Sequence, residues 1–266
     1  LSEQLTPWAA YVRDVARTRR PNRIHLSDAF CGMCGLFPTG APSRCLTPLV
    51  AQSRHLEQIG RNGGPWVGLI VGAGDTARQV PVEIWRTWIV RFLGLIPRGR
   101  VVLIGHGAEC ERAQNIQQTL PPSVLGRIWD ITGRTTIHEL AQTLSRCQRV
   151  IGSDTGPLHL AAAVGVPVIG WYFARARVHE TGPYGPNHRV WQAQSMDNGP
   201  VVPADWPIEP SLDLLLNDFP RSAPHWSEWI SHIDRWGTYY SEAGQTSPPP
   251  QEREHVWHEL SQAVPV

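Results

Sequence analysis

The sequence predicts an α/β protein built around a parallel β-sheet. Between residues 66 and 171, apolar segments of strand length alternate with segments whose apolar residues recur at helical spacing. Some strand segments, such as Val101–Ile104, are apolar throughout, which is typical of strands buried on both faces. Polar turns containing glycine follow three of the strands, at 72–75, 105–109 and 152–159. Because parallel strands end at one edge of a sheet, we expect these turns to lie together.

Each element of this region has its own signal. Pro81 suits a helix start, Thr136 and Glu139 have the spacing of a capping box, and Pro157 suits the first position of a further helix. Strands are expected at 66–71, 100–104, 127–131, 149–152 and 167–171, and helices at 81–96, 108–120, 137–146 and 157–164.

The flanking regions are less regular. Residues 1–62 form one predicted unit, 63–195 a Rossmann-like domain and 196–266 a helical extension, with a Gly- and Pro-containing linker at 61–65. Within the flanks we expect a strand at 23–26 and helices at 5–19, 49–59, 211–217, 225–236 and 252–263.

Composition narrows the function classes. The chain has 266 residues, 41% of them hydrophobic, and a net charge of +1, so no overall basic field favours a nucleic-acid partner. No apolar run approaches the roughly 18 residues of a membrane span, and no signal peptide is evident, so we expect a cytoplasmic protein. All 24 basic residues are Arg, so a cation that binds phosphate here is Arg or His.

The five cysteines favour free thiols in a reducing compartment. Cys31 and Cys34 have metal-ligand spacing and Cys45 could supply a third ligand, but no fourth ligand is evident. We therefore expect buried thiols and no metal.

The segment from Ser153 to His159 is the most informative part of the chain. A buried strand enters a polar turn and a helix opens, so backbone N–H groups without partners and the positive end of the helix dipole face one point. Such a helix start favours phosphate. Thr155 can donate its N–H and hydroxyl, Gly156 admits close approach of a ligand, and His159 points back toward the turn from one turn inside the helix.

Two interpretations are open at most of these positions. Asp154 either accepts hydrogen bonds from sugar hydroxyls or caps the helix, and His159 either binds diphosphate or is a core histidine. Arg78 is either a phosphate clamp or a solvated arginine. Glu109, or its neighbour Glu111, either binds the two ribose hydroxyls or stabilises a helix dipole. We favour the binding interpretations because these groups follow neighbouring strands. Gly72 and Gly74 would form a short loop that touches the same ligand.

Together these segments resemble glycosyltransferase family 9, the ADP-heptose:lipopolysaccharide heptosyltransferases, over about residues 66–192. The segments that carry the resemblance are Ser153–Pro167, Gly72–Gly74 with Arg78–Pro81, Val101–Gly105 with Glu109, and Gly182–Gly185.

The resemblance implies a GT-B-like fold of two Rossmann-like domains, of which residues 1–62 would be the end of the N-terminal, acceptor-side domain. It implies a nucleotide-diphosphate sugar, ADP-linked, as donor and no cofactor or metal. Its implied site residues are Arg78 at a phosphate, Glu109 at the ribose, Thr135 and Thr136 near adenine, Asp154 at the sugar, and Thr155, Gly156 and His159 at the diphosphate.

The chain departs from the family pattern in three places. Arg78 and Val80 stand where the family has Lys and Trp, and no Gly-Asp loop after a first strand supplies the family's general base. The catalytic residue is therefore unassigned, and Asp28 is not proposed for it.

The favoured hypothesis is an inverting transfer of a sugar, heptose by resemblance, to a hydroxyl of lipopolysaccharide, another glycan, a lipid-linked glycan or a protein. The acceptor would bring the protein to the inner face of the cytoplasmic membrane. The alternatives are a non-catalytic nucleotide-sugar-binding domain, suggested by the missing loop, and a nucleotide-sugar epimerase.

Overall fold

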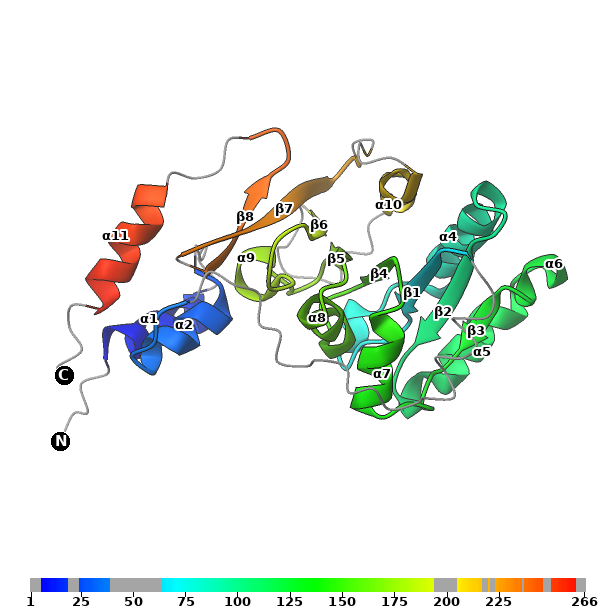
Figure 1. The fold of residues 1–266 in the computed structure, drawn as a ribbon, viewed down its shortest axis with the longest axis horizontal. Coiled ribbons are helices and arrows are strands. Elements are labelled where there is room, and N and C mark those ends of the chain that lie inside the picture. Colours follow the sequence, from blue (N-terminus) through cyan, green and yellow to red (C-terminus); the bar gives the residue numbers. More distant parts are fainter. Residues whose placement is uncertain are drawn as a thin grey trace.

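The computed structural model describes residues 6–18, 24–38, 64–193, 205–216, 220, 223–235, 237–245 and 250–261. Its centre is a sheet of eight strands in the order β3-β2-β1-β4-β5-β6-β7-β8 (Figure 1). The first six strands in sequence are parallel, and the last two add antiparallel pairs at one edge. The strands are β1 Trp66–Ile70, β2 Arg100–Ile104, β3 Ile128–Asp130, β4 Arg149–Gly152, β5 Val168–Tyr172, β6 Arg189–Ala193, β7 Trp226–Asp234 and β8 Gly237–Glu242.

Helices cover both faces of the sheet because alternate side chains of each strand point to opposite sides. On β1, Val67 and Leu69 join a core with α4, α5 and α10, whereas Trp66 and Ile70 join a second core with α7 and α8. The bounds of these helices are α4 Val82–Leu95, α5 Cys110–Gln118, α7 Ile137–Leu144, α8 Gly156–Ala163 and α10 Ile208–Leu216. The shorter elements are η1 Thr76–Arg78, η2 Gly107–Glu109, α6 Pro122–Leu125 and α9 Val178–Thr181.

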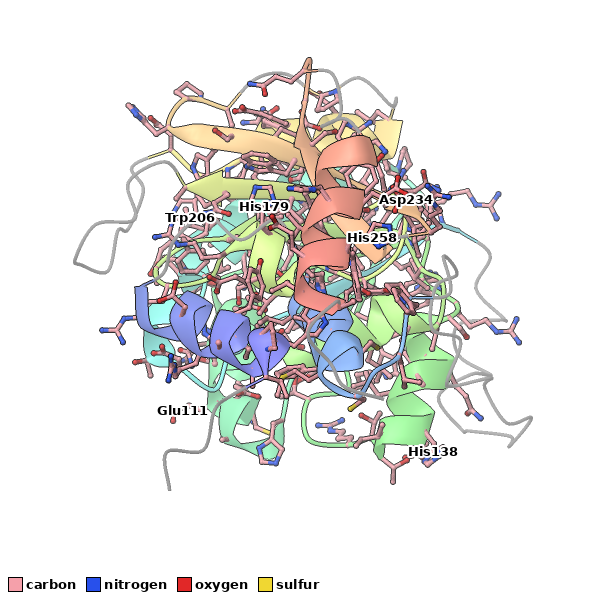
Figure 2. The ribbon with its side chains drawn as sticks, turned by 90° about the vertical axis from the view of Figure 1, so that its left-hand side faces the viewer. Glu111, His138, His179, Trp206, Asp234 and His258 are labelled. Carbon is pink, nitrogen blue, oxygen red and sulfur yellow. The ribbon has the colours of Figure 1, made fainter. Side chains whose placement is uncertain are left out.

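Aromatic side chains fill much of the first core. Trp85 of α4 stacks on Trp171 of β5 with ring centroids 5.1 Å apart, and both rings are fully buried. Trp206, labelled in Figure 2, also contacts Trp171 and in turn contacts Trp226 of β7. These large side chains attach the antiparallel edge to the parallel part of the sheet.

The first and last described helices form a third core beside the β7–β8 end of the sheet (Figure 1). These helices are α1 Pro7–Thr18, α2 Leu26–Met33 and α11 Pro250–Ser261. Trp8 of α1 packs on Trp257 of α11 with centroids 4.5 Å apart. The Asp28 carboxylate of α2 accepts hydrogen bonds from the Tyr184 hydroxyl and from Thr238 N of β8, which attaches this helical unit to the sheet.

The predicted parallel α/β architecture is confirmed, and the strands at 100–104 and 149–152 have the predicted bounds. Two flank predictions are wrong. The segment 225–236 is not a helix: Trp226–Asp234 is strand β7, because it pairs with both β6 and β8 in a way that local pattern does not reveal. Residues 24–26 form no strand, because His25 caps the helix that begins at Leu26.

The domain division stays a prediction, although 196–266 is not purely helical because β7 and β8 extend the main sheet. The predicted helix at 49–59 lies outside the described residues. None of the helices in the described ranges has the length and apolarity that crossing a membrane requires.

Candidate functional site: a cleft at the switch point of the sheet

The strand order 3-2-1-4-5-6 reverses direction between β1 and β4, and ligands of open α/β sheets bind outside the carboxyl ends of strands at such a point. A cleft of about 770 Å³ lies there. The three predicted glycine turns meet in it, as expected. Its lining includes Gly72, Ala73, Gly74, Thr76, Arg78, Gln79, Gly105, His106, Ala108, Glu109, Asp154, Thr155, Gly156, Pro157, His159 and Thr181.

The start of α8 opens into this cleft. Thr155 is the N-cap in extended conformation (φ −150°, ψ 158°), and no side chain caps the helix. The first backbone bonds of the helix are donated by Leu158 N and His159 N to Thr155 O. Gly156 is exposed, and a Cβ built on it would meet no atom within 4 Å. The helix start is therefore accessible to an anion, as the phosphate interpretation requires.

Asp154 accepts hydrogen bonds from several groups around the cleft. Its Oδ2 lies 3.2 Å from Arg78 Nη1 and 3.1 Å from Thr181 Oγ1, and its Oδ1 lies 3.1 Å from His159 Nε2 and 3.5 Å from the Tyr172 hydroxyl. Burial raises the pKa of Asp154, but the hydrogen bond and charge of His159, the charge of Arg78 and the Thr181 hydrogen bond outweigh it, so the pKa is lower than usual. Asp154 is thus an ionised, hydrogen-bonded carboxylate at pH 7.

These contacts argue against the structural interpretation of Asp154 and of His159, whereas their binding roles stay predictions. Asp154 is not the N-cap of α8, because Thr155 occupies that position. His159 is not a core histidine, because 38% of its side chain is exposed toward the cleft region. A carboxylate only accepts hydrogen bonds, so His159 donates its Nε2–H to Asp154.

Arg78 reaches the cleft from the loop after β1. The Asp75 side chain caps η1, and Arg78 at its end donates from Nη1 to Asp154 O over 2.9 Å as well as to Asp154 Oδ2. Arg112 of α5 donates to Val71 O (2.6 Å) and to Val80 O, so one guanidinium joins the two ends of this loop. Arg112 was not predicted, and its position in a polar helix carries no motif that would indicate this role.

Glu109 lies in the cleft but also has a structural role. Its carboxylate accepts a hydrogen bond from His106 N, and the His106 ring accepts one from Ala108 N, forming a capping box at η2. A Cβ at Gly72 would overlap the Glu109 side chain, so Gly72 is needed for Glu109 to pack there. The alternative Glu111 is exposed and outside the lining, at the periphery of Figure 2.

Thr135 and Thr136 are not among the residues that line the cleft. Thr136 caps α7 in a capping box with Glu139, at the end of a loop that approaches Gly107 through Gly133. The structure therefore groups the other eight predicted residues and leaves these two beside the group.

Thr181 and Tyr172 belong to the site although the sequence did not indicate them. Thr181 ends α9, a single turn between β5 and β6, and Tyr172 is the last residue of β5. In the sequence, only the position of Tyr172 at the end of a strand could have indicated its role. For Thr181, only its place before Gly182 could have done so.

No metal site is found where the chain is described: no three His, Cys, Asp or Glu residues cluster suitably there. Cys31 is free and half-buried and Cys34 is free and exposed, so the prediction of buried thiols is wrong for both, whereas Cys147 is free and buried. Cys45 lies outside the described residues.

Strand order, an accessible helix start and a carboxylate between Arg and His define a Rossmann-type domain with a cleft at the switch point of its sheet. The sequence profile of glycosyltransferase family 9 (heptosyltransferase) matches residues 47–202, more than half of the chain, so this chain belongs to that family.

Individual relatives agree. Lipooligosaccharide heptosyltransferase 2 of Haemophilus influenzae is 32% identical over 106 residues, which is 39% of this chain and 31% of the relative. The chain thus matches about a third of that protein's length. A glycosyltransferase family 9 structure from Veillonella parvula superimposes with a TM-score of 0.52 at 20% identity, covering 66% of this chain and 51% of that one. ADP-heptose LPS heptosyltransferase II of E. coli covers 51% of this chain and 41% of its own, with 19% identity and a TM-score of 0.46. The GT-B-like fold class is confirmed.

Proposed function

We propose that this chain binds a nucleotide-diphosphate sugar and serves as the donor side of an inverting glycosyltransferase that transfers heptose from ADP-heptose. The observation that carries the proposal is the open start of α8 beside Arg78, His159 and Asp154 in one cleft. Family membership supports the transfer chemistry, and the name of the Haemophilus relative supports the sugar.

The cleft divides into parts that suit the parts of such a donor. Amide N–H groups at Thr155 and Gly156, with Arg78 and His159, would bind the diphosphate. Glu109 would bind the ribose between Gly72 and Gly105, and Asp154 would accept hydrogen bonds from the sugar. Thr135 and Thr136 remain proposed neighbours of the adenine, reached from the Gly133 side of the cleft.

The same groups would assist departure of the donor diphosphate. Negative charge develops on this leaving group as the glycosidic bond breaks, and a helix N-terminus and a guanidinium that are already in place stabilise that charge without reorganisation. A general base must still deprotonate the acceptor hydroxyl, and we assign it to no residue of this chain.

The proposed acceptor is a hydroxyl of lipopolysaccharide, another glycan, a lipid-linked glycan or a protein. A lipid-bearing acceptor would bring the protein to the inner face of the cytoplasmic membrane.

Calorimetry with ADP-heptose, a UDP-sugar and a GDP-sugar tests the proposal. We expect saturable binding of ADP-heptose and weaker binding of the other two. If none of the three binds at millimolar concentration, the proposal is wrong.

A second function, donor binding without transfer, rests on one observation: no Gly-Asp loop that would supply the family's general base is found among these 266 residues. An assay for ADP release in the presence of a lipopolysaccharide acceptor separates the two. ADP-heptose binding without ADP release would favour the binding domain.

A further inference from the structure

We propose that Thr181 and Tyr172 form a positioning pair that aims the Asp154 carboxylate at the sugar of the donor. This inference deepens the proposed function and rests on it. It assigns a role in sugar recognition to the end of α9, between β5 and β6, which lies outside the motif that begins α8.

The pair consists of two consecutive hydrogen bonds. The Tyr172 hydroxyl donates to Thr181 O over 2.7 Å, and the Thr181 hydroxyl donates to Asp154 Oδ2 over 3.1 Å. The Tyr172 oxygen also lies 3.5 Å from Asp154 Oδ1, but its single proton favours Thr181 O, which is much the closer acceptor. The Thr181 hydroxyl also lies 3.3 Å from Arg177 O, but its single proton favours the charged and closer acceptor. Tyr172 has no exposed surface, so the first bond is protected from water.

Thr181 is itself held firmly in place. It is the last residue of α9, where carbonyl groups lack partners inside the helix, and Tyr172 supplies one to Thr181 O. His25, the N-cap of α2, donates from Nε2 to the next carbonyl, Gly182 O, over 2.8 Å. A side chain at Gly182 would overlap the Tyr240 ring, so this turn fits closely between its neighbours.

The four partners of Asp154 differ in charge. Arg78 is cationic, His159 donates from a ring N–H, and both lie beside the helix start, where they would bind a diphosphate. Thr181 and Tyr172 are neutral and would not be drawn away by an anion. When a diphosphate takes over Arg78 and His159, the carboxylate keeps Thr181 as its fixed partner and has free lone pairs to accept sugar hydroxyls.

This difference makes the inference testable with two probes, ADP and ADP-heptose, on the full chain. Thr181→Val keeps the shape of the side chain and removes the hydroxyl, and Tyr172→Phe removes only the phenol oxygen. We expect Thr181→Val to weaken ADP-heptose binding about tenfold, the effect of one hydrogen bond to a charged group. Tyr172→Phe should weaken it less, about threefold, because it acts through Thr181. The Kd for ADP should change by less than about twofold in either variant, since ADP carries no sugar.

Matched controls separate positioning from packing. Tyr240→Phe removes a buried phenol bond of the same length, to Pro183 O, in the same region but without contact to Asp154. Thr143→Val removes a buried threonine bond to Glu139 O on α7. Neither control should change the ratio of the Kd for ADP-heptose to the Kd for ADP. Thr181→Ser, which keeps the hydroxyl, should have the same ratio as the unaltered chain.

The inference is overturned if Thr181→Val raises the Kd for ADP and the Kd for ADP-heptose equally, or if it changes neither. If Thr181→Val does not fold, Thr181→Ala and Tyr172→Phe carry the same comparison. If the unaltered chain binds neither probe, the proposed function itself has failed. If it binds both and the variants keep its ratio of dissociation constants, only the inference has failed.

Discussion

At the scale of single residues, Asp154 shows why residue type alone left its role open. An Asp after a strand and before a helix is equally suited to capping and to ligand binding. In the structure Thr155 takes the cap position and Asp154 turns toward Arg78, His159 and Thr181, so Asp154 is not the cap, and sugar binding stays a prediction. The carboxylate is negatively charged and cannot itself bind phosphate, so its nitrogen donors Arg78 and His159 are the groups that we assign to the diphosphate.

Arg78 therefore has an effect on binding that differs from that of Thr181. We predict that Arg78→Gln weakens ADP and ADP-heptose binding alike, by about tenfold or more, because it removes a charge-assisted contact to the shared diphosphate. Arg78→Lys, which restores the family's residue type, should retain most of the affinity. Arg86→Gln is the matched control, since Arg86 bonds only Thr119 O among the contacts found for it and lies outside the cleft lining. An unchanged ADP affinity in Arg78→Gln would remove Arg78 from the diphosphate site.

At the scale of elements, the attachment of α2 to α9 depends on a neutral histidine. His25 accepts a hydrogen bond from Ser27 N at Nδ1 and donates from Nε2 to Gly182 O. Burial lowers the pKa of His25 from 6.5 to about 4, against the raising effect of the Gly182 bond. A folded-state pKa below the unfolded value means that the unfolded chain binds the proton first, so stability falls as pH drops from about 6.5 to about 4.

The variant His25→Asn tests whether His25 makes the folded protein less stable as the pH falls. Asn keeps a cap acceptor for Ser27 N but cannot titrate, so the variant should lose less stability than the unaltered chain between pH 7.5 and pH 5. The two stability losses should differ by about 2 kcal/mol, because pH 5 lies roughly 1.5 units below the unfolded pKa of His25. Burial raises the pKa of Asp28 to about 6, so protonation of Asp28 increases stability as the pH falls. Asp28 is present in both proteins, so its contribution cancels when they are compared. Urea unfolding at pH 7.5 and pH 5 measures the free energy of unfolding of both proteins. If both lose the same stability between these pH values, the low pKa of His25 is contradicted.

At the scale of the whole molecule, the parallel part of the fold could be predicted because its signals are local. Continuously apolar strands, Pro at helix starts and capping boxes each act within a few residues, and the bounds of β2 and β4 follow from them. β7 could not be predicted, because its strand conformation depends on pairing with β6 and β8. The same reason explains why Thr181, Tyr172 and Arg112 were missed: they enter the site through contacts between distant segments.

Most of the predicted site could be found because three loops at one edge of a parallel sheet must lie close together. Thr135 and Thr136 follow the shorter strand β3 at the edge of the sheet, and their loop ends in the capping box of α7 rather than in the cleft. The predicted residues that line the cleft thus lie near the switch point, whereas Thr135 and Thr136 lie farther from it.

The central claim is that the amides where α8 begins bind the diphosphate of a nucleotide sugar. Amide NMR spectra of the ¹⁵N-labelled chain, recorded during titrations with ADP and with AMP, test it most directly. We predict that ADP shifts the Thr155 and Gly156 resonances strongly and that AMP, which has one phosphate fewer, shifts them much less. If ADP binds while Thr155 and Gly156 stay unshifted, or if ADP and AMP shift them equally, these amides do not bind the diphosphate.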